Sequence, residues 1–257
     1  MNYIGIDIGS TCAKTVVLDK KKEIIQEFVQ PTGWSSVDTA EEIRQKLGLN
    51  GINLSDDSSF CVATGYGRIS VPYAGKTVTE ITCHALGAVH LFQQLDLTVV
   101  DIGGQDTKII QIEQGFVKDF IMNDKCAAGT GRFLEVMANT LSLRPNEMFH
   151  LARLGSDTTI SSMCTVFAES EVIGLIGKGE PKENIAYAVV NSTIRKVAAQ
   201  VSRMNGEMST FCLTGGLCEC DYIREALSKE LGKEVISCPD ARYAGAIGAA
   251  LSAMKVR

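Results

Sequence analysis

One short pattern occurs twice in the chain, and this repeat constrains the fold more than any other feature. Residues 7–10 read Asp-Ile-Gly-Ser and are followed by Lys14, while residues 101–104 read Asp-Ile-Gly-Gly and are followed by Lys108. In both copies the lysine comes seven residues after the aspartate, and apolar runs stand on both sides of the turn. Each copy therefore predicts a strand, a tight turn and a returning strand. Two such copies predict two similar lobes, each of which opens with a β-hairpin.

Apolar periodicity along the rest of the 257 residues predicts an α/β chain. We expect further strands at 23–29, 60–64, 211–216 and 235–237. We expect helices from Ser36 or Asp38 through Leu47, and at 79–95, 133–138, 147–153, after 161–171, and at 183–204, 221–231 and 241–254. The first lobe is predicted at residues 1–96 and the second at residues 97–257, each with a mixed sheet and helices.

Charge and hydropathy exclude several classes of protein. The net charge of −5 argues against a general binder of nucleic acid or of anionic membranes. No apolar run reaches the roughly 18 residues of a membrane span. A strand-like segment follows Met1 almost at once, without the basic region, apolar core and cleavage site of a signal peptide. We therefore expect a cytoplasmic protein.

The repeated turns carry the residue types that bind phosphate. Glycine lets the backbone approach an oxyanion, and backbone N–H groups, hydroxyls and a lysine can then bind it. An aspartate at the strand end can hold Mg²⁺ directly or through water. A single turn of this kind is usually an ordinary hairpin, but a third glycine turn, at 214–216, also follows a strand. Three glycine turns can surround one nucleotide.

The candidate nucleotide residues follow from these turns. We expect the phosphates and Mg²⁺ to contact Asp7, Gly9, Ser10, Thr11, Lys14, Asp101, Gly103, Gly104 and Lys108. We expect the adenosine to lie against Gly215, Gly216 and Gly245. Gln105 and Asp106, in the second turn, are candidates for orienting the attacking water, with an ordinary turn role as the alternative. Asp7 is the remaining catalytic candidate.

Cysteine usage points to reduced thiols. The nine cysteines are odd in number and contain no Cys-x-x-Cys pair, so neither a disulfide framework nor a self-contained zinc ribbon is expected. Cys126 is followed by small residues and then by apolar residues at helical spacing, which predicts that it lies at or just before a helix N-terminus. Backbone N–H groups and the helix dipole favour a thiolate there. A buried structural cysteine is the alternative.

Other side chains have simpler interpretations. Cys218 and Cys220 are the second choice as metal ligands, because their Cys-x-Cys spacing can chelate, but packing near the nucleotide explains them better. Cys12, Cys61, Cys83 and Cys238 are expected to fill space or to lie in the core. His84 and His90 do not share a helix face, and Trp34 is expected to pack at a loop tip.

The motifs resemble those of a known superfamily. Residues 6–11, 100–106 and 212–216 are similar to the phosphate-1, phosphate-2 and adenosine motifs of the actin, sugar-kinase and heat-shock-chaperone ATPases. Residues 123–133 and 164–171 resemble one branch: the ATP-dependent activators (archerases) of 2-hydroxyacyl-CoA dehydratases and the ATP-hydrolysing subunits of benzoyl-CoA reductases. The resemblance covers essentially the whole chain. It implies two actin-like (ribonuclease H-like) lobes with a nucleotide cleft between them.

This resemblance also implies a cofactor and partners. It implies ATP or ADP with Mg²⁺, and a homodimer that holds one 4Fe–4S cluster between its subunits, with Cys126 and Cys164 as the ligands from each chain. Two cysteines 38 positions apart give only two thiolates per chain, and a two-fold axis doubles them. Ferredoxin or flavodoxin is the implied electron donor.

The expected function is therefore ATP-driven electron transfer. The chain would deliver a low-potential electron to a partner enzyme, in the first place a 2-hydroxyacyl-CoA dehydratase. A benzoyl-CoA-type reductase or a double-cubane cluster protein is the alternative partner. A small-molecule kinase of the same superfamily is the alternative of a different class; it would need a substrate pocket and a catalytic base, but no cysteines ahead of helices.

Overall fold

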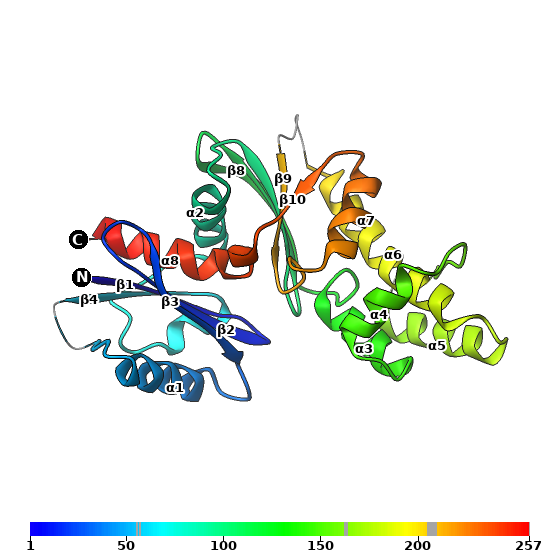
Figure 1. Cartoon of the computed structure of the whole chain (residues 1–257), viewed down its shortest axis with the longest axis horizontal. Helices are drawn as coiled ribbons and strands as arrows, with labels where there is room; N and C mark the ends of the chain where they lie inside the picture. The colour runs from blue at the N-terminus through cyan, green and yellow to red at the C-terminus, as the bar shows by residue number, and fades with distance from the viewer. Residues whose placement is uncertain (55, 57, 162–163, 205–209, 257) are drawn as a thin grey trace. The chain divides into compact units, whose positions relative to one another are not determined.

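Two five-stranded sheets organise the computed structural model, which describes residues 1–54, 56, 58–161, 164–204 and 210–256. The first sheet has the order β3 (Ile24–Pro31), β2 (Cys12–Leu18), β1 (Asn2–Ile8), β4 (Ser59–Thr64) and β5 (Lys76–Thr77). The second has the order β10 (Val235–Ile236), β9 (Thr210–Gly215), β6 (Leu97–Ile102), β7 (Thr107–Glu113) and β8 (Phe116–Asn123). Read from β8, the second order repeats the first strand for strand, so the duplication seen in the motifs extends to both sheets (Figure 1).

The first sheet is mixed. β1 pairs antiparallel with β2 and β2 with β3, whereas β1 pairs parallel with β4 and β4 with β5. In the opening hairpin Asp7 lies directly across from Lys14. β9 and β10 of the second sheet are also parallel. These directions confirm the predicted α/β class with mixed sheets.

Packing divides the chain into two units. Unit 1 comprises Met1–Val99, Ile110–Lys118 and Asp240–Arg257, and unit 2 comprises Val100–Ile109 and Asp119–Pro239. The C-terminal helix therefore groups with residues near the N-terminus. The lobe boundary predicted between residues 96 and 97 stays a prediction about domain organisation.

Helices cover both faces of the first sheet. Strand side chains alternate between faces, so Ile4, Ile6 and Ile8 form a core with α1 (Ser36–Leu49), while Val16 and Leu18 pack on α8 (Ala244–Val256). α8 also packs on α2 (Glu80–Phe92). A Cβ on Gly5 would collide with the backbone of α8 at Ala246. The absence of a side chain there lets the Ala- and Gly-rich helix lie directly on β1.

Unit 2 adds a group of helices. They are α3 (Gly131–Thr140), α4 (Pro145–Ala152), α5 (Thr165–Gly177), α6 (Lys182–Val201) and α7 (Asp221–Leu231). Among them α6 has the longest buried face, from Ile185 to Val201. The described residues also form two 3₁₀ turns, η1 (Tyr66–Ser70) and η2 (Pro239–Tyr243). None of the helices within the described ranges is both long enough and apolar enough to cross a membrane.

A few local expectations were wrong. Ser35, rather than Ser36 or Asp38, caps α1, because its Oγ accepts a hydrogen bond from the Asp38 N–H at 3.2 Å. Trp34 is fully exposed instead of packed at a loop tip, and Cys238 is half-buried instead of lying in the core. Strand β8 was not predicted from the sequence at all.

Candidate functional site

The first glycine turn joins β1 to β2 in unit 1. The Gly9 N–H donates to the Cys12 carbonyl at 3.1 Å, which closes the turn, and the Thr32 hydroxyl donates to the Gly9 carbonyl at 2.7 Å. Ser10 and Thr11 are exposed at the tip, and Lys14 is half-buried. One backbone hydrogen bond and the Thr32 hydroxyl thus fix the turn, while the hydroxyl side chains of Ser10 and Thr11 face solvent.

Asp7 lies buried at the end of β1, 3% exposed. A Cβ on Gly65 would stand 2.5 Å from its Oδ1, and one on Gly245 would stand 2.6 Å from its Oδ2 and 3.0 Å from His84 Nε2. The Nε2 of His84 is in turn 3.7 Å from Glu80 Oε1. Two glycines and a buried histidine therefore enclose the Asp7 carboxylate. His84 is thus a buried polar neighbour of the Asp7 carboxylate. Nothing in the sequence indicated that three distant segments meet there.

The second glycine turn joins β6 to β7 and belongs to unit 2. The Gly103 N–H donates to the Asp106 carbonyl at 2.9 Å, and Gly104 and the exposed Gln105 form the tip. Asp106 is buried, so of the two candidates for orienting water only Gln105 reaches solvent. The Gly103 carbonyl accepts from the Gly131 N–H at 2.9 Å, which ties the turn to the start of α3.

Lys108 lies between two carboxylates. Its Nζ is 2.8 Å from Asp106 Oδ2 and 3.3 Å from Asp101 Oδ2, and the side chain is almost completely buried. Thr214 Oγ1 also donates to Asp101, at 2.7 Å. One ammonium between two carboxylates leaves one net negative charge in this cluster, which suits a nearby divalent cation. The ammonium itself binds carboxylates instead of pointing into solvent.

The third glycine turn follows β9 and lies against the second. Gly215 has a φ of +86°, and a Cβ there would stand 2.5 Å from the Ile102 carbonyl. Only glycine fits this approach, which brings the end of β9 beside Asp101. Gly216 is exposed and has open space around it. In unit 2 the structure therefore brings together the second and third glycine turns, whereas Gly245 lies in unit 1 beside Asp7.

The nine cysteines differ in exposure. Cys126 and Cys164 are exposed, and the other seven are buried or half-buried. Cys164 is the N-cap of α5, which begins at Thr165, inside the segment 161–171 that was expected to lead into this helix. Cys126 lies further from its helix than expected, because α3 begins only at Gly131 with Thr130 as its N-cap. A separate turn intervenes, in which the Thr130 N–H donates to the Ala127 carbonyl at 3.0 Å.

Side chains around Cys126 hold its loop in place. The Asn123 amide donates to the carbonyls of Cys126 at 2.9 Å and of Ala128 at 3.1 Å. The Thr107 hydroxyl donates to the Gly129 carbonyl at 2.6 Å. This loop is therefore attached to Thr107, the first residue of β7, directly after the second glycine turn. These contacts could not be predicted from the sequence, in which only the polar residues themselves are visible.

The alternative pair of cysteine ligands has the opposite environment. Cys218 is buried, and burial raises the pKa of the Cys220 thiol. Burial also raises the pKa of Cys212, Cys61 and Cys83. Metal ligation requires the thiolate, so these thiols are poorly suited to it. Within the part of the chain that the structure describes, no three Cys, His, Asp or Glu side chains stand close enough to hold a metal ion.

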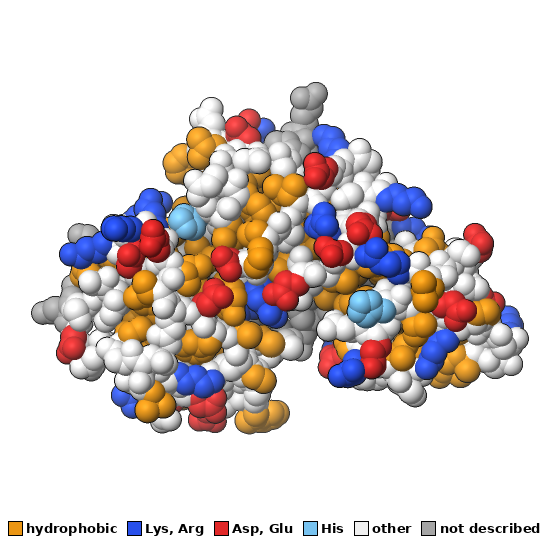
Figure 2. Space-filling view, viewed as in Figure 1, with side chains coloured by type: hydrophobic (Ala, Val, Ile, Leu, Met, Phe, Trp, Pro, Cys, Tyr) orange, Lys and Arg blue, Asp and Glu red, His pale blue; other side chains and the backbone are white. Residues whose placement is uncertain are grey.

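Apolar side chains are exposed next to Cys164. On α5 the exposed fractions are 66% for Val166, 67% for Phe167 and 58% for Ile173. Figure 2 shows hydrophobic side chains at the surface of the helical part of unit 2, where Figure 1 draws α4 and α5. Large exposed apolar side chains gathered on one helix are typical of a surface that another protein covers.

Comparisons with known proteins agree with these features. The family described as the BadF/BadG/BcrA/BcrD ATPase family matches residues 4–253. The (R)-2-hydroxyglutaryl-CoA dehydratase activating ATPase of Acidaminococcus fermentans is 43% identical over 257 residues, which cover 98% of this chain and 96% of that protein. The activator of lactoyl-CoA dehydratase of Anaerotignum propionicum is 40% identical over 255 residues, which cover 98% of this chain and 97% of that protein.

A solved structure has the same fold. The activator of the 2-hydroxyisocaproyl-CoA dehydratase from Clostridium difficile, with bound ADPNP, superposes with a TM-score of 0.91 at 35% identity. The match covers 100% of this chain and 95% of that one. It confirms the predicted actin-like fold.

Proposed function

This chain belongs to the BadF/BadG/BcrA/BcrD ATPase family, and we propose on that premise that it is an ATPase that activates a 2-hydroxyacyl-CoA dehydratase by delivering a low-potential electron. The proposal rests first on one observation. Of nine cysteines, the two in the motifs that resemble the activators, Cys126 and Cys164, are the exposed ones. The names of the relatives, dehydratase activators at 40% and 43% identity, supply the partner class.

The glycine turns are the proposed nucleotide residues. We expect ATP phosphates to bind the N–H groups and hydroxyls at Gly9, Ser10 and Thr11, with Lys14 adding positive charge, and the N–H groups at Gly103 and Gly104. Lys108 contributes indirectly by holding Asp101 and Asp106.

The carboxylates and the third turn have separate proposed roles. Asp7 and Asp101 hold Mg²⁺, directly or through water, and Gln105 orients the attacking water with support from Asp106. Gly216 and Gly215 lie against the adenosine. Gly245 keeps the space beside Asp7 free of a side chain.

Cys126 and Cys164 fit a 4Fe–4S cluster. Both thiols are exposed, and Cys164 is the N-cap of α5, where helix N–H groups favour negative charge. When bound, such a cluster supplies one-electron transfer at low potential. One chain offers two thiolates and the cluster commonly takes four, so we propose that two copies of the chain provide them together.

The exposed face of α5 is the proposed contact between the two copies. Val166 and Phe167 are two and three residues after Cys164, so a partner that covers them also comes close to the cysteine. Covering apolar side chains stabilises the dimer, and the same contact excludes water from the cysteines. Dimer formation and cluster binding are therefore expected to depend on each other.

ATP is proposed to act by shifting a conformational equilibrium. Nucleotide must bind one state of the chain better than another, and hydrolysis must remove that preference. The contacts from Gly103 to Gly131 and from Thr107 to Gly129 are the routes by which the second glycine turn can move the Cys126 loop. A ferredoxin or flavodoxin is the proposed electron donor.

The test is activation of the partner. An inactive 2-hydroxyacyl-CoA dehydratase should gain dehydratase activity when it is mixed with the anaerobically purified protein, reduced donor, ATP and Mg²⁺. ADP should not replace ATP in this mixture. Cys126→Ser should retain ATP binding and lose activation. Colourless, iron-free protein that transfers phosphate from ATP to a sugar would contradict the proposal and favour a small-molecule kinase.

A further inference from the structure

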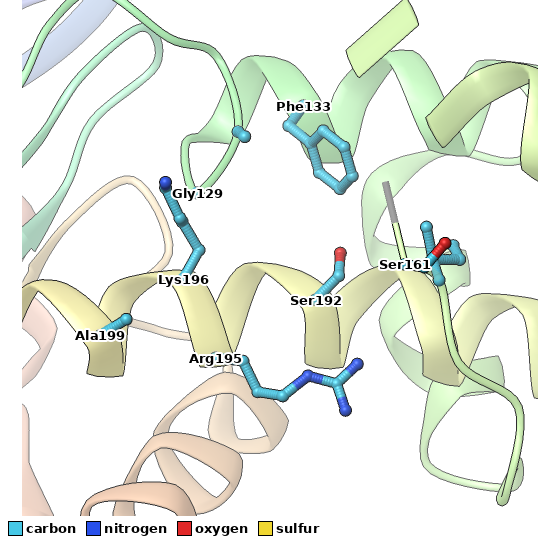
Figure 3. Close-up of a pocket in the computed structure, with 9 residues that line it drawn as sticks. Gly129, Phe133, Ser161, Ser192, Arg195, Lys196 and Ala199 are labelled. Atoms are coloured by element: carbon cyan, nitrogen blue, oxygen red, sulfur yellow. The ribbon is translucent and has the colours of Figure 1, made fainter. Parts of the chain in front are cut away.

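Unit 2 contains a cavity of about 210 Å³ that none of the proposed nucleotide or cysteine residues lines. One wall is the segment Ala128 and Gly129 with Phe133 at the start of α3, a second is Ile160 and Ser161, and the third is the face of α6 from Ser192 to Ala199 (Figure 3). The cavity thus lies between the segments that follow Cys126 and precede Cys164.

Two cations stand on the α6 wall. Arg195 and Lys196 are neighbours in sequence, and neither has an acidic side chain within ion-pair distance among the residues that the structure describes. Figure 3 shows the Lys196 side chain reaching toward Gly129, and the Ser192 side chain pointing toward Phe133 across the open space. The Arg195 side chain leaves α6 on the side away from Phe133 (Figure 3), so Lys196 is the cation that points into the cavity, with Arg195 adding positive charge nearby. An uncompensated cation at a cavity favours an anion.

Gln200 provides an independent indication. It lies one turn after Lys196 on α6, is 4% exposed, and its amide oxygen and nitrogen both lack hydrogen-bond partners among the described residues. Its Nε2 is 3.8 Å from the position of a Cβ on Gly129, so the amide faces the same loop. A buried amide without a partner is costly, and an anion's oxygen is one group that the Nε2 can bind.

The other walls of the cavity indicate which chemical groups the bound anion is attached to. Ser192 donates its hydroxyl to the Val189 carbonyl at 2.7 Å, so its oxygen is left as an acceptor. Glu171 accepts hydrogen bonds from the Ser161 N–H and hydroxyl and so fixes that wall. Phe133 offers an apolar surface. The cationic end and the apolar wall suit a phosphate group attached to a small organic molecule.

We propose that this cavity binds the phosphate group of a small molecule, with Lys196 neutralising its charge, Arg195 adding positive charge nearby, and Gln200 Nε2 donating a hydrogen bond to it. The phosphate can come from two sources, the ATP of the proposed function or a separate phosphorylated metabolite. The binding chemistry is the same for both. The site rests on the cavity and its charges, and does not require the proposed electron transfer.

The test measures binding of inorganic phosphate by isothermal titration calorimetry. If the natural ligand is a separate metabolite, wild-type protein should bind phosphate in the absence of nucleotide. It should bind phosphate equally well when ADPNP and Mg²⁺ occupy the glycine turns. The double variant Arg195→Gln, Lys196→Gln should weaken this binding at least tenfold. Lys182→Gln, which removes an exposed lysine at the start of the same helix, is the matched control and should leave binding unchanged.

The second source has its own signature. If ATP supplies the phosphate, ADPNP should abolish phosphate binding, and the double variant should weaken ADPNP itself at least tenfold while Lys182→Gln does not. Circular dichroism should show that both variants are folded. Two results would overturn the proposal. The first is a double variant that binds phosphate and ADPNP with the affinities of the wild type. The second is a wild-type protein that binds no phosphate and whose ADPNP affinity does not depend on these two cations.

Discussion

At the scale of single residues, Lys108 is expected to matter for stability more than for contact with nucleotide. Its ammonium is buried against Asp101 and Asp106. Lys108→Met leaves two buried carboxylates without their cation, which should lower the free energy of unfolding by about 3 to 5 kcal/mol. Urea denaturation measures this loss. Lys14→Met, at the equivalent but only half-buried position, is the control and should cost clearly less; equal costs would contradict the assignment.

Gly216 offers a clean probe of the proposed adenosine contact. A side chain at Gly215 would collide with Ile102, whereas Gly216 has open space. Gly216→Leu should therefore leave the fold intact and weaken ADP and ADPNP alike, by roughly tenfold or about 1.4 kcal/mol. Equilibrium titration with both nucleotides measures this. A loss confined to ADPNP would place Gly216 at the phosphates instead.

The sequence predicted which residues form the turns but not where their side chains go. The seven-residue spacing made Lys14 and Lys108 look equivalent, yet only Lys108 is buried between carboxylates. The adenosine contact of Gly245 stays a prediction, but the sequence did not show that this glycine lies beside Asp7 and His84. Both differences arise because contacts between segments far apart in sequence depend on tertiary packing, which local patterns do not contain.

At the scale of elements, α5 is the helix whose exposed face needs an explanation. Phe167→Asp places a charge on that face next to Cys164, so it should weaken the proposed dimer by about 2 kcal/mol or more and release the iron with it. Sedimentation velocity and iron analysis measure both effects. Leu154→Asp, on an equally exposed apolar residue outside α5, is the control and should keep dimer and iron. A Phe167→Asp protein that remains an iron-containing dimer would move the interface away from α5.

Element boundaries followed from sequence where periodicity was strong. The two hairpins, α6 and the C-terminal Ala- and Gly-rich helix were predicted close to their observed bounds. Strand β8 was missed because most of its side chains are exposed and it carries Lys118 and Asp119, so its pattern has little apolar alternation. Cys126 was expected at or just before the start of α3, but a turn separates the two. The small residues after Cys126 are compatible with a turn as well as with a helix start.

At the scale of the whole molecule, the duplication is the feature that sequence predicted best. A motif repeated at Asp7 and Asp101 became two sheets with the same strand order. The arrangement within each unit leaves two exposed cysteines per chain and, among described residues, no group of three possible metal ligands. The proposed four-thiolate cluster would therefore take its other two thiolates from a second copy of the chain.

Native mass spectrometry of anaerobically purified protein tests this central claim most directly. We expect a dimer that carries one cluster, with about two iron atoms per chain, and a Cys126→Ser protein that has lost the iron but still binds ADPNP. A monomer that holds four iron atoms, or a Cys126→Ser protein that keeps the cluster, would contradict the claim that two chains share one cluster through Cys126 and Cys164.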